Sequence, residues 1–310
     1  MALKSSDVMA VKGKGFLRNR GTDCFSGRVV APGTVFSAED LKTISYIAQN
    51  FGNGKAFATS RLSIEVSGIP YEKIDECIAY ANAHGLYFGG TGAKIRPITA
   101  CKGTTCVFGN FDTQGLAEKI HNEFYLGWKN VTLPHKFKIG VGGCPNSCMK
   151  PSLNDVGIEG HSAPVINLDN CRGCANCAII NSCPLKAASL KNGKISIDPS
   201  LCLTCGVCAG KCPFGAIDSN KKVEYQIYVG GTWGKRTRMG TPLKRLVGED
   251  EILSTLEKII LWYRDNAYNK ERLGMTVDRI GADKMEADIL GDDLLLRKEE
   301  ILKKEISNRG

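Results

Sequence analysis

The sequence predicts an α+β protein whose second unit is interrupted by a cysteine-rich segment. Its 310 residues are enough for roughly two or three domains. Short alternating stretches, typical of half-buried strands, are interleaved with amphipathic helical stretches, a pattern typical of α+β layers. Twelve of the 14 cysteines lie between Cys101 and Cys212, in tight groups that interrupt this pattern. The hydrophobic content of 43% excludes global disorder.

The first unit is predicted to span residues 1–88. Ser37 begins a capping box, and the apolar spacing that follows predicts an amphipathic helix. Residues 61–66 alternate between polar and apolar side chains, which predicts a strand with Arg61 on its polar face. A second amphipathic helix is predicted to begin at Pro70. Strands and helices of these lengths form one α+β layer.

The second unit is predicted to begin with residues 89–163. Residues 94–99 read as a short strand, and the proline within it favours an edge or a bulge. Asp112 is placed to cap a helix over residues 113–127. Residues 136–141 predict a further strand, on which two lysines lie opposite three apolar side chains.

The segment 164–221 has little helical periodicity and is predicted to be an insertion, because the earlier pattern resumes after it. Residues 223–229 alternate as a strand, and residues 249–265 form the clearest amphipathic helix of the chain. Both belong to a second part of the interrupted unit, residues 222–287. The chain closes with a charged tail, residues 288–310, that has an amphipathic helical pattern.

The inserted segment carries two runs of cysteines. The second run, CLTCGVCAGKCP from Cys202, has the spacing of bacterial ferredoxins, and the first, from Cys171, differs by a last gap two residues longer. Zinc, the alternative, usually takes two C-x2-C knuckles per ion. In two-cluster ferredoxins the fourth cysteine of each run binds the other cluster. We therefore predict two [4Fe–4S] clusters, one on Cys171, Cys174, Cys177 and Cys212, the other on Cys202, Cys205, Cys208 and Cys183.

Four further cysteines form a third group, Cys101-x4-Cys106 and Cys144-x3-Cys148. Their spacing alone leaves both zinc and a third [4Fe–4S] cluster open.

The chain carries 41 basic and 32 acidic residues, a net charge of +9. Three four-thiolate clusters at about −2 each would cancel most of this excess. No dense run of Lys and Arg with interleaved aromatic residues appears, so we expect no nucleic-acid partner. No apolar run approaches the roughly 18 residues of a membrane span, and the first residues lack the apolar stretch of a signal peptide. A cytoplasmic protein without a membrane partner is expected.

Several segments carry a family resemblance. GCPNSCMKPSLNDVGI, with LPHKFKIGV before it, resembles the cluster-and-sirohaem motif of the sirohaem-dependent sulfite and nitrite reductases. ATSRLSIEVSGI resembles the strand of their ferredoxin-like half-domain, and YVGGTWGKRTRMG and MTVDRIG resemble later segments of their haem domain. The likeness covers roughly residues 14–285. With its inserted ferredoxin pattern, the chain is most similar to catalytic subunits of anaerobic, assimilatory-type sulfite reductases.

The resemblance implies a fold, cofactors and site residues. Residues 1–88 would form the ferredoxin-like half-domain, and residues 89–163 and 222–287 an α/β sirohaem/[4Fe–4S] domain, into which a two-cluster ferredoxin domain is inserted. Cys101, Cys106, Cys144 and Cys148 would hold a third [4Fe–4S] cluster, with Cys148 bridging to the sirohaem iron. The family's anion-binding residues fall on Arg61, Arg96, Lys136 and Lys138. Asn146, Gly230, Gly231 and Arg238 lie where the family approaches the sirohaem.

The implied reaction is the six-electron reduction of sulfite to sulfide. Electrons would arrive through the inserted clusters from a protein donor, such as a ferredoxin or reductase subunits, because no flavin or nucleotide motif appears. The chain has one copy of a module that larger members duplicate, which implies pairing with itself or with a sister subunit. Two alternatives stay open: reduction of nitrite to ammonia, and an electron-transfer subunit without haem. The set of cations argues against the latter.

Overall fold

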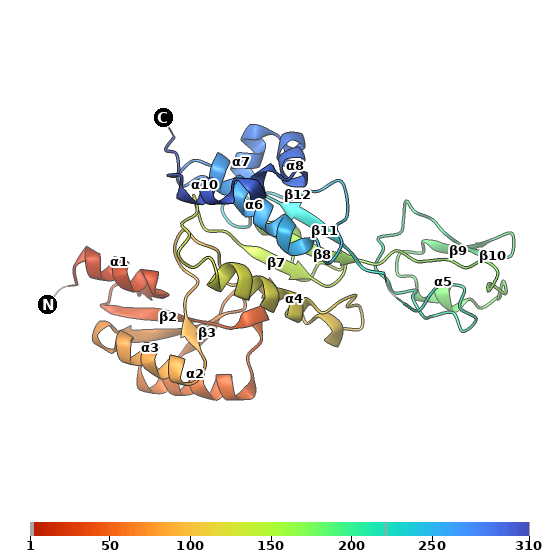
Figure 1. Ribbon diagram of the computed structural model, residues 1–310. Helices are drawn as coiled ribbons and strands as arrows, with labels where there is room; N and C mark the ends of the chain where they lie inside the picture. Colours follow the sequence, from red (N-terminus) through yellow and green to blue (C-terminus); the bar gives the residue numbers. More distant parts are fainter. Residues whose placement is uncertain (1–2, 221, 310) are drawn as a thin grey trace.

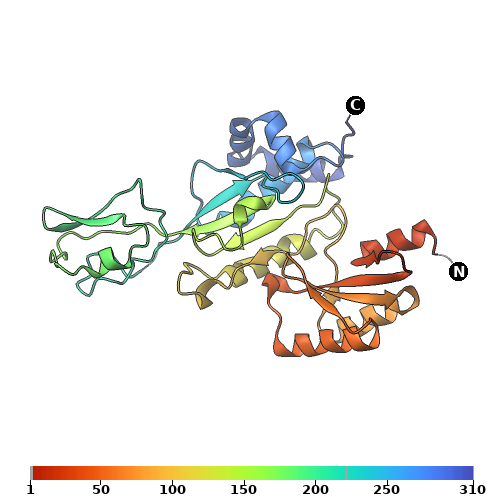
Figure 2. The same cartoon turned by 180° about the vertical axis from the view of Figure 1, so that it is seen from behind.

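The computed structural model describes residues 3–220 and 222–309 of the chain. Figure 1 shows an N-terminal α+β unit, a second unit built on a central sheet, and a smaller segment that projects away from both. The view from behind in Figure 2 shows the same three parts, with the projecting segment joined to the central sheet only. The predicted α+β class is confirmed.

The N-terminal unit is an antiparallel sheet in the order β1-β2-β4-β3, with β5 also paired to β2. Three helices flank it, and its core contains Phe16, Phe25, Ile47, Val66 and Ile69. The strands are β1 (Phe16–Arg18), β2 (Cys24–Val30), β3 (Ala56–Ala58), β4 (Ile64–Pro70) and β5 (Tyr87–Phe88), and the helices are α1 (Ser5–Gly13), α2 (Ala38–Asn50) and α3 (Ile74–Ala83).

Local signals predicted α2 well and the strand at 61–66 less well. Ser37 caps α2 by accepting from the N–H of Asp40, as predicted. The strand begins only at Ile64, because polar side chains close a turn before it: Thr59 and Ser63 bond through both backbone and hydroxyl groups. Leu62 lies in this turn with φ of 54° and is 41% exposed, so it does not share the buried face. Arg61 therefore lies in a turn and not on a strand.

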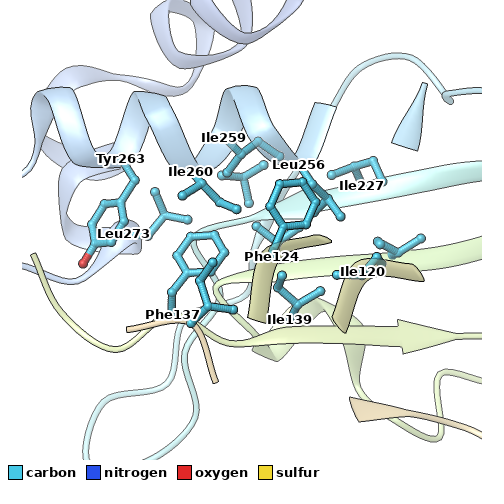
Figure 3. Close-up of a cluster of buried hydrophobic side chains, with 14 of the residues drawn as sticks. Ile120, Phe124, Phe137, Ile139, Ile227, Leu256, Ile259, Ile260, Tyr263 and Leu273 are labelled. Atoms are coloured by element: carbon cyan, nitrogen blue, oxygen red, sulfur yellow. The ribbon is translucent and has the colours of Figure 1, made fainter. Parts of the chain in front are cut away.

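The central sheet has the order β12-β11-β8-β7-β6. Strands β6, β7 and β8 run parallel, whereas β8, β11 and β12 are antiparallel. Helix α6 covers one face of the sheet. Phe124, Phe137 and Ile227 meet its apolar side in a single large core (Figure 3). The bounds are β6 (Thr99–Ala100), β7 (Ile139–Gly142), β8 (Val156–His161), β11 (Glu224–Val229), β12 (Thr241–Pro242), α4 (Thr113–Ile120), a π-helical turn (His121–Leu126) and α6 (Ile252–Asn266). Short 3₁₀ turns cover Pro32–Thr34, Tyr71–Lys73, Gly103–Thr105 and Pro151–Leu153.

The two predicted strands at 94–99 and 136–141 are shorter than their patterns indicated. Before β6 and β7 the two stretches meet only in a bridge between Ile95 and Phe137, and Pro97 has no N–H with which to extend the ladder. The alternation nevertheless persists, because Phe137 and Ile139 are fully buried while the lysines on either side of Phe137 are half-buried. The lysines thus share one side, as predicted.

The projecting segment leaves the sheet at the end of β8 and returns at the start of β11. His161 and Glu224 are register partners, so the two ends of this excursion lie side by side. The segment contains α5 (Ala178–Ser182) and a hairpin of β9 (Ala188–Lys191) and β10 (Lys194–Ile197) around a small core of its own. An insertion at this point leaves the central sheet intact.

The C-terminal region folds against α6 instead of forming a free tail. It contains α7 (Leu273–Ile280), α8 (Ala282–Leu290), α9 (Asp293–Leu296) and α10 (Lys298–Lys303). Ile301 is fully buried, and Lys298 forms an ion pair with Glu257 of α6 at 2.6 Å. Among the helices within the described residues, none is both long and apolar enough to span a bilayer.

Candidate functional site

Four cysteines meet at one edge of the central sheet. Cys101 directly follows β6, and Cys144 lies two residues beyond β7. Because parallel strands end at the same edge, their loops converge there. Cys101, Cys106, Cys144 and Cys148 line a single cavity of about 430 Å³, which we call the cluster cavity. Burial and the three other thiols raise the pKa of Cys144, in keeping with thiols gathered around one space.

A second space, the central cavity of about 310 Å³, adjoins the cluster cavity. Its lining includes Cys148, Arg61, Lys138, Asn154 and Trp233. Cys148 borders both cavities. Lys150 lines the central cavity as well, so a ligand there would lie beside both a cluster thiol and three cationic residues.

A third space, the cationic cavity of about 210 Å³, brings together the four cations that the sequence singled out. It is lined by Arg28, Arg61, Ser63, Gly90, Arg96, Pro97, Lys136 and Lys138, and none of these described residues is acidic. Arg61 and Lys138 also line the central cavity. Five cations around one small space favour an anion as its occupant.

Arg28 is a member of this site that the sequence analysis missed. Strand β2 alternates, with Phe25 and Val29 buried, and Arg28 lies on the opposite face with partial exposure. This alternation was the available signal. Arg28 bonds Glu65 of β4 through Nε at 2.8 Å and also through Nη2, which holds it beside the cavity.

Backbone carbonyls and an amide fix the other two arginines. Arg61 donates to Oδ1 of Asn154 at 2.6 Å and to the carbonyl of Pro97 at 2.8 Å. Arg96 donates to the carbonyl of Gly92 at 2.9 Å and to that of Gly90. The Nε groups of Arg61 and Arg96 are buried and have no hydrogen-bond partner among the described residues. Both Nε atoms are closed to solvent, so they add to the cost of burying these guanidinium groups.

Burial lowers the pKa of every cation that sequence analysis placed here. The pKa of Lys138 falls to about 8, first because the ammonium is desolvated and then because Arg61 and Lys136 are near. Desolvation and then Arg272 lower the pKa of Lys136 as well. The pKa values of Arg61 and Arg96 fall to about 10, chiefly by burial, so both guanidinium groups stay charged at neutral pH. Lys138 is the group whose proton is easiest to release.

A buried ion pair holds the backbone of the stretch that carries Lys136 and Lys138. Asp155 is fully buried and pairs with Arg272 at 2.8 Å, and its other oxygen accepts the N–H of Lys138 at 2.9 Å. Neither Asp155 nor Arg272 was singled out from the sequence, although Asp155 lies within the quoted motif SLNDVGI. The pair fixes the backbone from which the Lys138 side chain reaches the cavity.

The remaining predicted residues lie in different places. Asn146 lines the cluster cavity. Gly230 and Gly231 directly follow β11. A Cβ on Gly231 would collide with the carbonyl of Ser152 in the Pro151–Leu153 turn, and a Cβ on Gly230 would lie 2.9 Å from Gly274. Arg238 bonds Asp278 at 2.7 Å and the carbonyl of Gly230 at 3.1 Å. Gly230, Gly231 and Arg238 do not line any of the three cavities.

In the projecting segment, one predicted set of cysteines surrounds a common space. Cys183, Cys202, Cys205 and Cys208 line one small apolar pocket, so the longer gap before Cys183 still lets it reach the second run. Within the described residues, no three His, Cys, Asp or Glu side chains converge as the ligands of one metal ion would. A four-iron cluster carries its thiolates at separate irons, farther apart than the ligands of one zinc ion.

These features are a cavity lined by four cysteines next to a cavity lined by cations. The comparisons identify the family, and the chain belongs to the nitrite and sulfite reductases. Residues 91–294 match the nitrite and sulphite reductase 4Fe-4S domain, and residues 18–84 match the nitrite/sulfite reductase ferredoxin-like half domain. The resemblance drawn from the sequence is thereby confirmed. The inserted ferredoxin domain stays a prediction.

Named relatives include two sulfite reductases. The chain is 32% identical to the coenzyme F420-dependent sulfite reductase of Methanocaldococcus jannaschii, over 89% of this chain but only 42% of that protein. It is 31% identical to a subunit of the anaerobic sulfite reductase of Salmonella typhimurium, over 82% of this chain and 77% of that one.

Solved structures share the fold. Dissimilatory sulfite reductase I matches with a TM-score of 0.70 and 22% identity, over 86% of this chain and 69% of that chain. The NirA protein of Mycobacterium tuberculosis matches with a TM-score of 0.64 and 16% identity, over 99% of this chain and 49% of that chain.

Proposed function

We propose that this protein reduces sulfite to sulfide at a sirohaem adjoining a [4Fe–4S] cluster. One observation carries the proposal: the cationic cavity meets, through Arg61 and Lys138, a central cavity that is bordered by the cluster cysteine Cys148. An anion site next to a thiol-lined metal site is what an oxyanion reductase needs. An electron-transfer subunit without haem would have no use for the anion site.

The residues present fit both cofactors. Four thiols around the cluster cavity are the usual ligand set of a [4Fe–4S] cluster, and Cys148, which borders both cavities, would help to hold the sirohaem as well. The sirohaem would occupy the central cavity. When bound, this pair would supply the electrons and the metal centre at which sulfur–oxygen bonds break.

The five cations of the cationic cavity would bind sulfite and offset its charge. Arginine donors suit an oxyanion because their fork matches two oxygens. Carbonyl contacts hold the side chains of Arg61 and Arg96 in place before the substrate arrives. The site is therefore preorganised for an anion.

Lys138 and Lys136 would supply protons. Reduction of sulfite to sulfide releases its three oxygens as water, so protons must be delivered as each bond breaks. A lysine with a pKa near 8 gives up its proton far more readily than an arginine, and solvent can replace the proton after each step.

The projecting segment would act as the electron entry. Its Cys202–Cys208 run touches the core: Ser162 donates to the carbonyl of Thr204 at 2.7 Å, and a Cβ on Gly206 would lie 2.6 Å from Oδ1 of Asn110. Asn110 in turn donates to the carbonyl of Gly143, next to Cys144, at 3.0 Å. The cluster on Cys183, Cys202, Cys205 and Cys208 would therefore pass electrons to the core cluster.

The other inserted cluster would receive electrons from outside. Its ligand Cys171 lies beside Ile195 of β10, within the part that projects from the sheet in Figures 1 and 2. A protein donor would dock there. Because the relative in Salmonella is named as a subunit, we include assembly with itself or with a sister subunit in the proposal.

The proposal is tested by product analysis. Anaerobically purified holoenzyme is supplied with sulfite and a reduced viologen dye, and sulfide and consumed electrons are counted. The expected result is one sulfide per six electrons, with nitrite assayed in parallel. If the enzyme reduces nitrite but not sulfite, its substrate is nitrite. If cofactor-loaded protein reduces neither anion, the proposal is overturned.

A further inference from the structure

One backbone carbonyl accepts hydrogen bonds from two arginines of the cationic cavity. The carbonyl of Gly90 accepts Nη1 of Arg28 at 2.8 Å and Nη1 of Arg96. Arg28 comes from β2 of the N-terminal unit, whereas Arg96 precedes β6 of the central sheet. The position of this carbonyl therefore sets the spacing of two cations that arrive from different units.

Gly90 owes its position to a hydroxyl outside the cavity. Its N–H donates to Oη of Tyr125 at 3.0 Å. Its backbone has φ of 74°, a left-handed conformation that glycine adopts without strain. The hydrogen bond to Tyr125 holds the Gly89–Gly90 peptide and thereby limits where the following carbonyl points.

Tyr125 lies in an unusual helical turn. The His121–Leu126 segment is π-helical, with the N–H of Gly127 bonded five residues back to Asn122 at 3.1 Å. Such wide turns often occur at functional sites. The ring of Tyr125 lies 4.7 Å from the ring of buried His121, which is itself bonded to the hydroxyl of Tyr87. The aromatic cluster keeps the hydroxyl aimed at the glycine turn.

The neighbouring glycine shows how close this approach is. A Cβ on Gly89 would overlap Oη of Tyr125, while the next tyrosine atom, Cζ, would lie at 3.5 Å, an ordinary contact. Gly89 has no left-handed backbone that would itself exclude alanine. The absence of a side chain at 89 is therefore what admits the hydroxyl.

We infer that Tyr125 is a positioning residue for the anion site, which acts by holding the Gly89–Gly90 turn so that the Gly90 carbonyl seats Arg28 and Arg96. It does not line the cationic cavity and would not touch the substrate. The inference rests on the proposed function, because it assigns Tyr125 to the binding of the same oxyanion.

The test compares Tyr125→Phe, Gly89→Ala and their combination in holoenzyme, with Tyr228→Phe as the matched control. Tyr228 is a half-buried tyrosine whose hydroxyl contacts Glu159 at 3.4 Å, away from the three cavities. The readouts are the dissociation constant of sulfite by calorimetry, KM and kcat, and iron content. Loss of one hydrogen bond predicts a dissociation constant and KM raised about three- to ten-fold in Tyr125→Phe, with kcat within about two-fold.

Gly89→Ala should weaken sulfite binding at least as much, because its methyl group displaces the hydroxyl. The double variant should be no worse than Tyr125→Phe, because without the hydroxyl the methyl group fits. Wild-type binding in Tyr125→Phe, or additive losses in the double variant, would overturn the inference. If Tyr125→Phe does not accumulate as holoenzyme, Gly89→Ala alone tests the inference. In that case, a wild-type dissociation constant for sulfite in Gly89→Ala would overturn it. Wild-type protein that binds neither sulfite nor nitrite would instead overturn the proposed function.

Discussion

Both carboxylate oxygens of Asp155 accept hydrogen bonds from one guanidinium nitrogen of Arg272, at 2.8 and 2.9 Å. Asp155 is fully buried. This pair joins the start of β8 to the turn before α7, two segments more than one hundred residues apart. Because Asp155 also accepts the N–H of Lys138, the pair links the packing of the second unit to the geometry of the anion site.

Removal of Arg272 should be strongly destabilising. Arg272→Ala leaves the buried Asp155 carboxylate without its partner, which is expected to lower the free energy of unfolding by about 3–5 kcal/mol. Chemical denaturation of the holoenzyme measures this. Arg245→Ala is the control, because Arg245 pairs with Glu251 at 2.6 Å on the surface and should cost less than about 1 kcal/mol. Equal losses in the two variants would contradict the assignment.

Lys138 should make turnover fall at alkaline pH. Its pKa is lowered to about 8, so the protonated form that donates is lost as the pH rises through that value. Burial of the ammonium lowers this pKa most, Arg61, Lys136 and Arg272 lower it further, and Asp155 raises it. In the free enzyme, kcat/KM should therefore decline above about pH 8. Lys138→Arg should lower kcat, because arginine does not release its proton, and should also remove the decline, because arginine stays charged. Sulfite itself titrates near neutrality, so nitrite serves as the second substrate. If kcat/KM of Lys138→Arg still declines above about pH 8, Lys138 is not the proton donor.

Arg28 should behave as a fifth member of the anion site. Arg28→Lys keeps a charge but loses the fork that reaches Gly90 and Glu65, and we expect KM for sulfite to rise about ten-fold, the value of one charge-assisted hydrogen bond. Alanine variants of Arg61 and Arg96 should also act mainly on KM, whereas those of Lys136 and Lys138 should lower kcat as well. Arg18→Ala, at an exposed pair with Asp23, is the control. Wild-type kinetics in fully loaded Arg28→Lys would exclude Arg28 from the site.

Cys183 should be a ligand and Cys77 should not. Cys183→Ser is expected to lower iron content by up to about four atoms per chain, since the serine removes one corner of a cluster. Cys77 is fully buried in the core of the N-terminal unit, and burial raises the pKa of its thiol to about 12. Cys77→Ser should leave the iron content unchanged. Full iron in Cys183→Ser, measured with its electron paramagnetic resonance spectrum, would contradict the pairing of the two runs.

Elements with strong local signals could be predicted from the sequence. The Ser37 capping box fixed the start of α2, and the apolar stripe that begins near Ile252 predicted α6, because both depend on neighbours in the chain. The turn at Leu62 was missed, since its alternation imitates a strand and only the Thr59–Ser63 bonds distinguish it. The strands predicted over residues 94–99 and 136–141 were too long for the same reason, because the alternating pattern begins before the residues that pair as strands.

The site was predicted in part. The two lysines could be grouped because they lie two residues apart in an alternating stretch, although β7 begins only at Ile139. Arg28 could not be joined to them, because its place depends on the Gly90 carbonyl, a contact across 62 residues. The Asp155–Arg272 pair spans 117 residues and has no local signature. The amphipathic pattern of the final segment indicated a helix, but it could not show that Ile301 is buried in the same core as α6.

The central claim, a sirohaem enzyme with three clusters, is tested most directly by the visible spectrum and metal content of anaerobically purified protein. We expect about twelve irons in clusters plus one haem iron per chain, with the distinct bands of sirohaem above broad iron–sulfur absorption. The bands should shift when sulfite is added. Protein that contains mainly zinc, or that shows cluster absorption without haem bands, would contradict the claim.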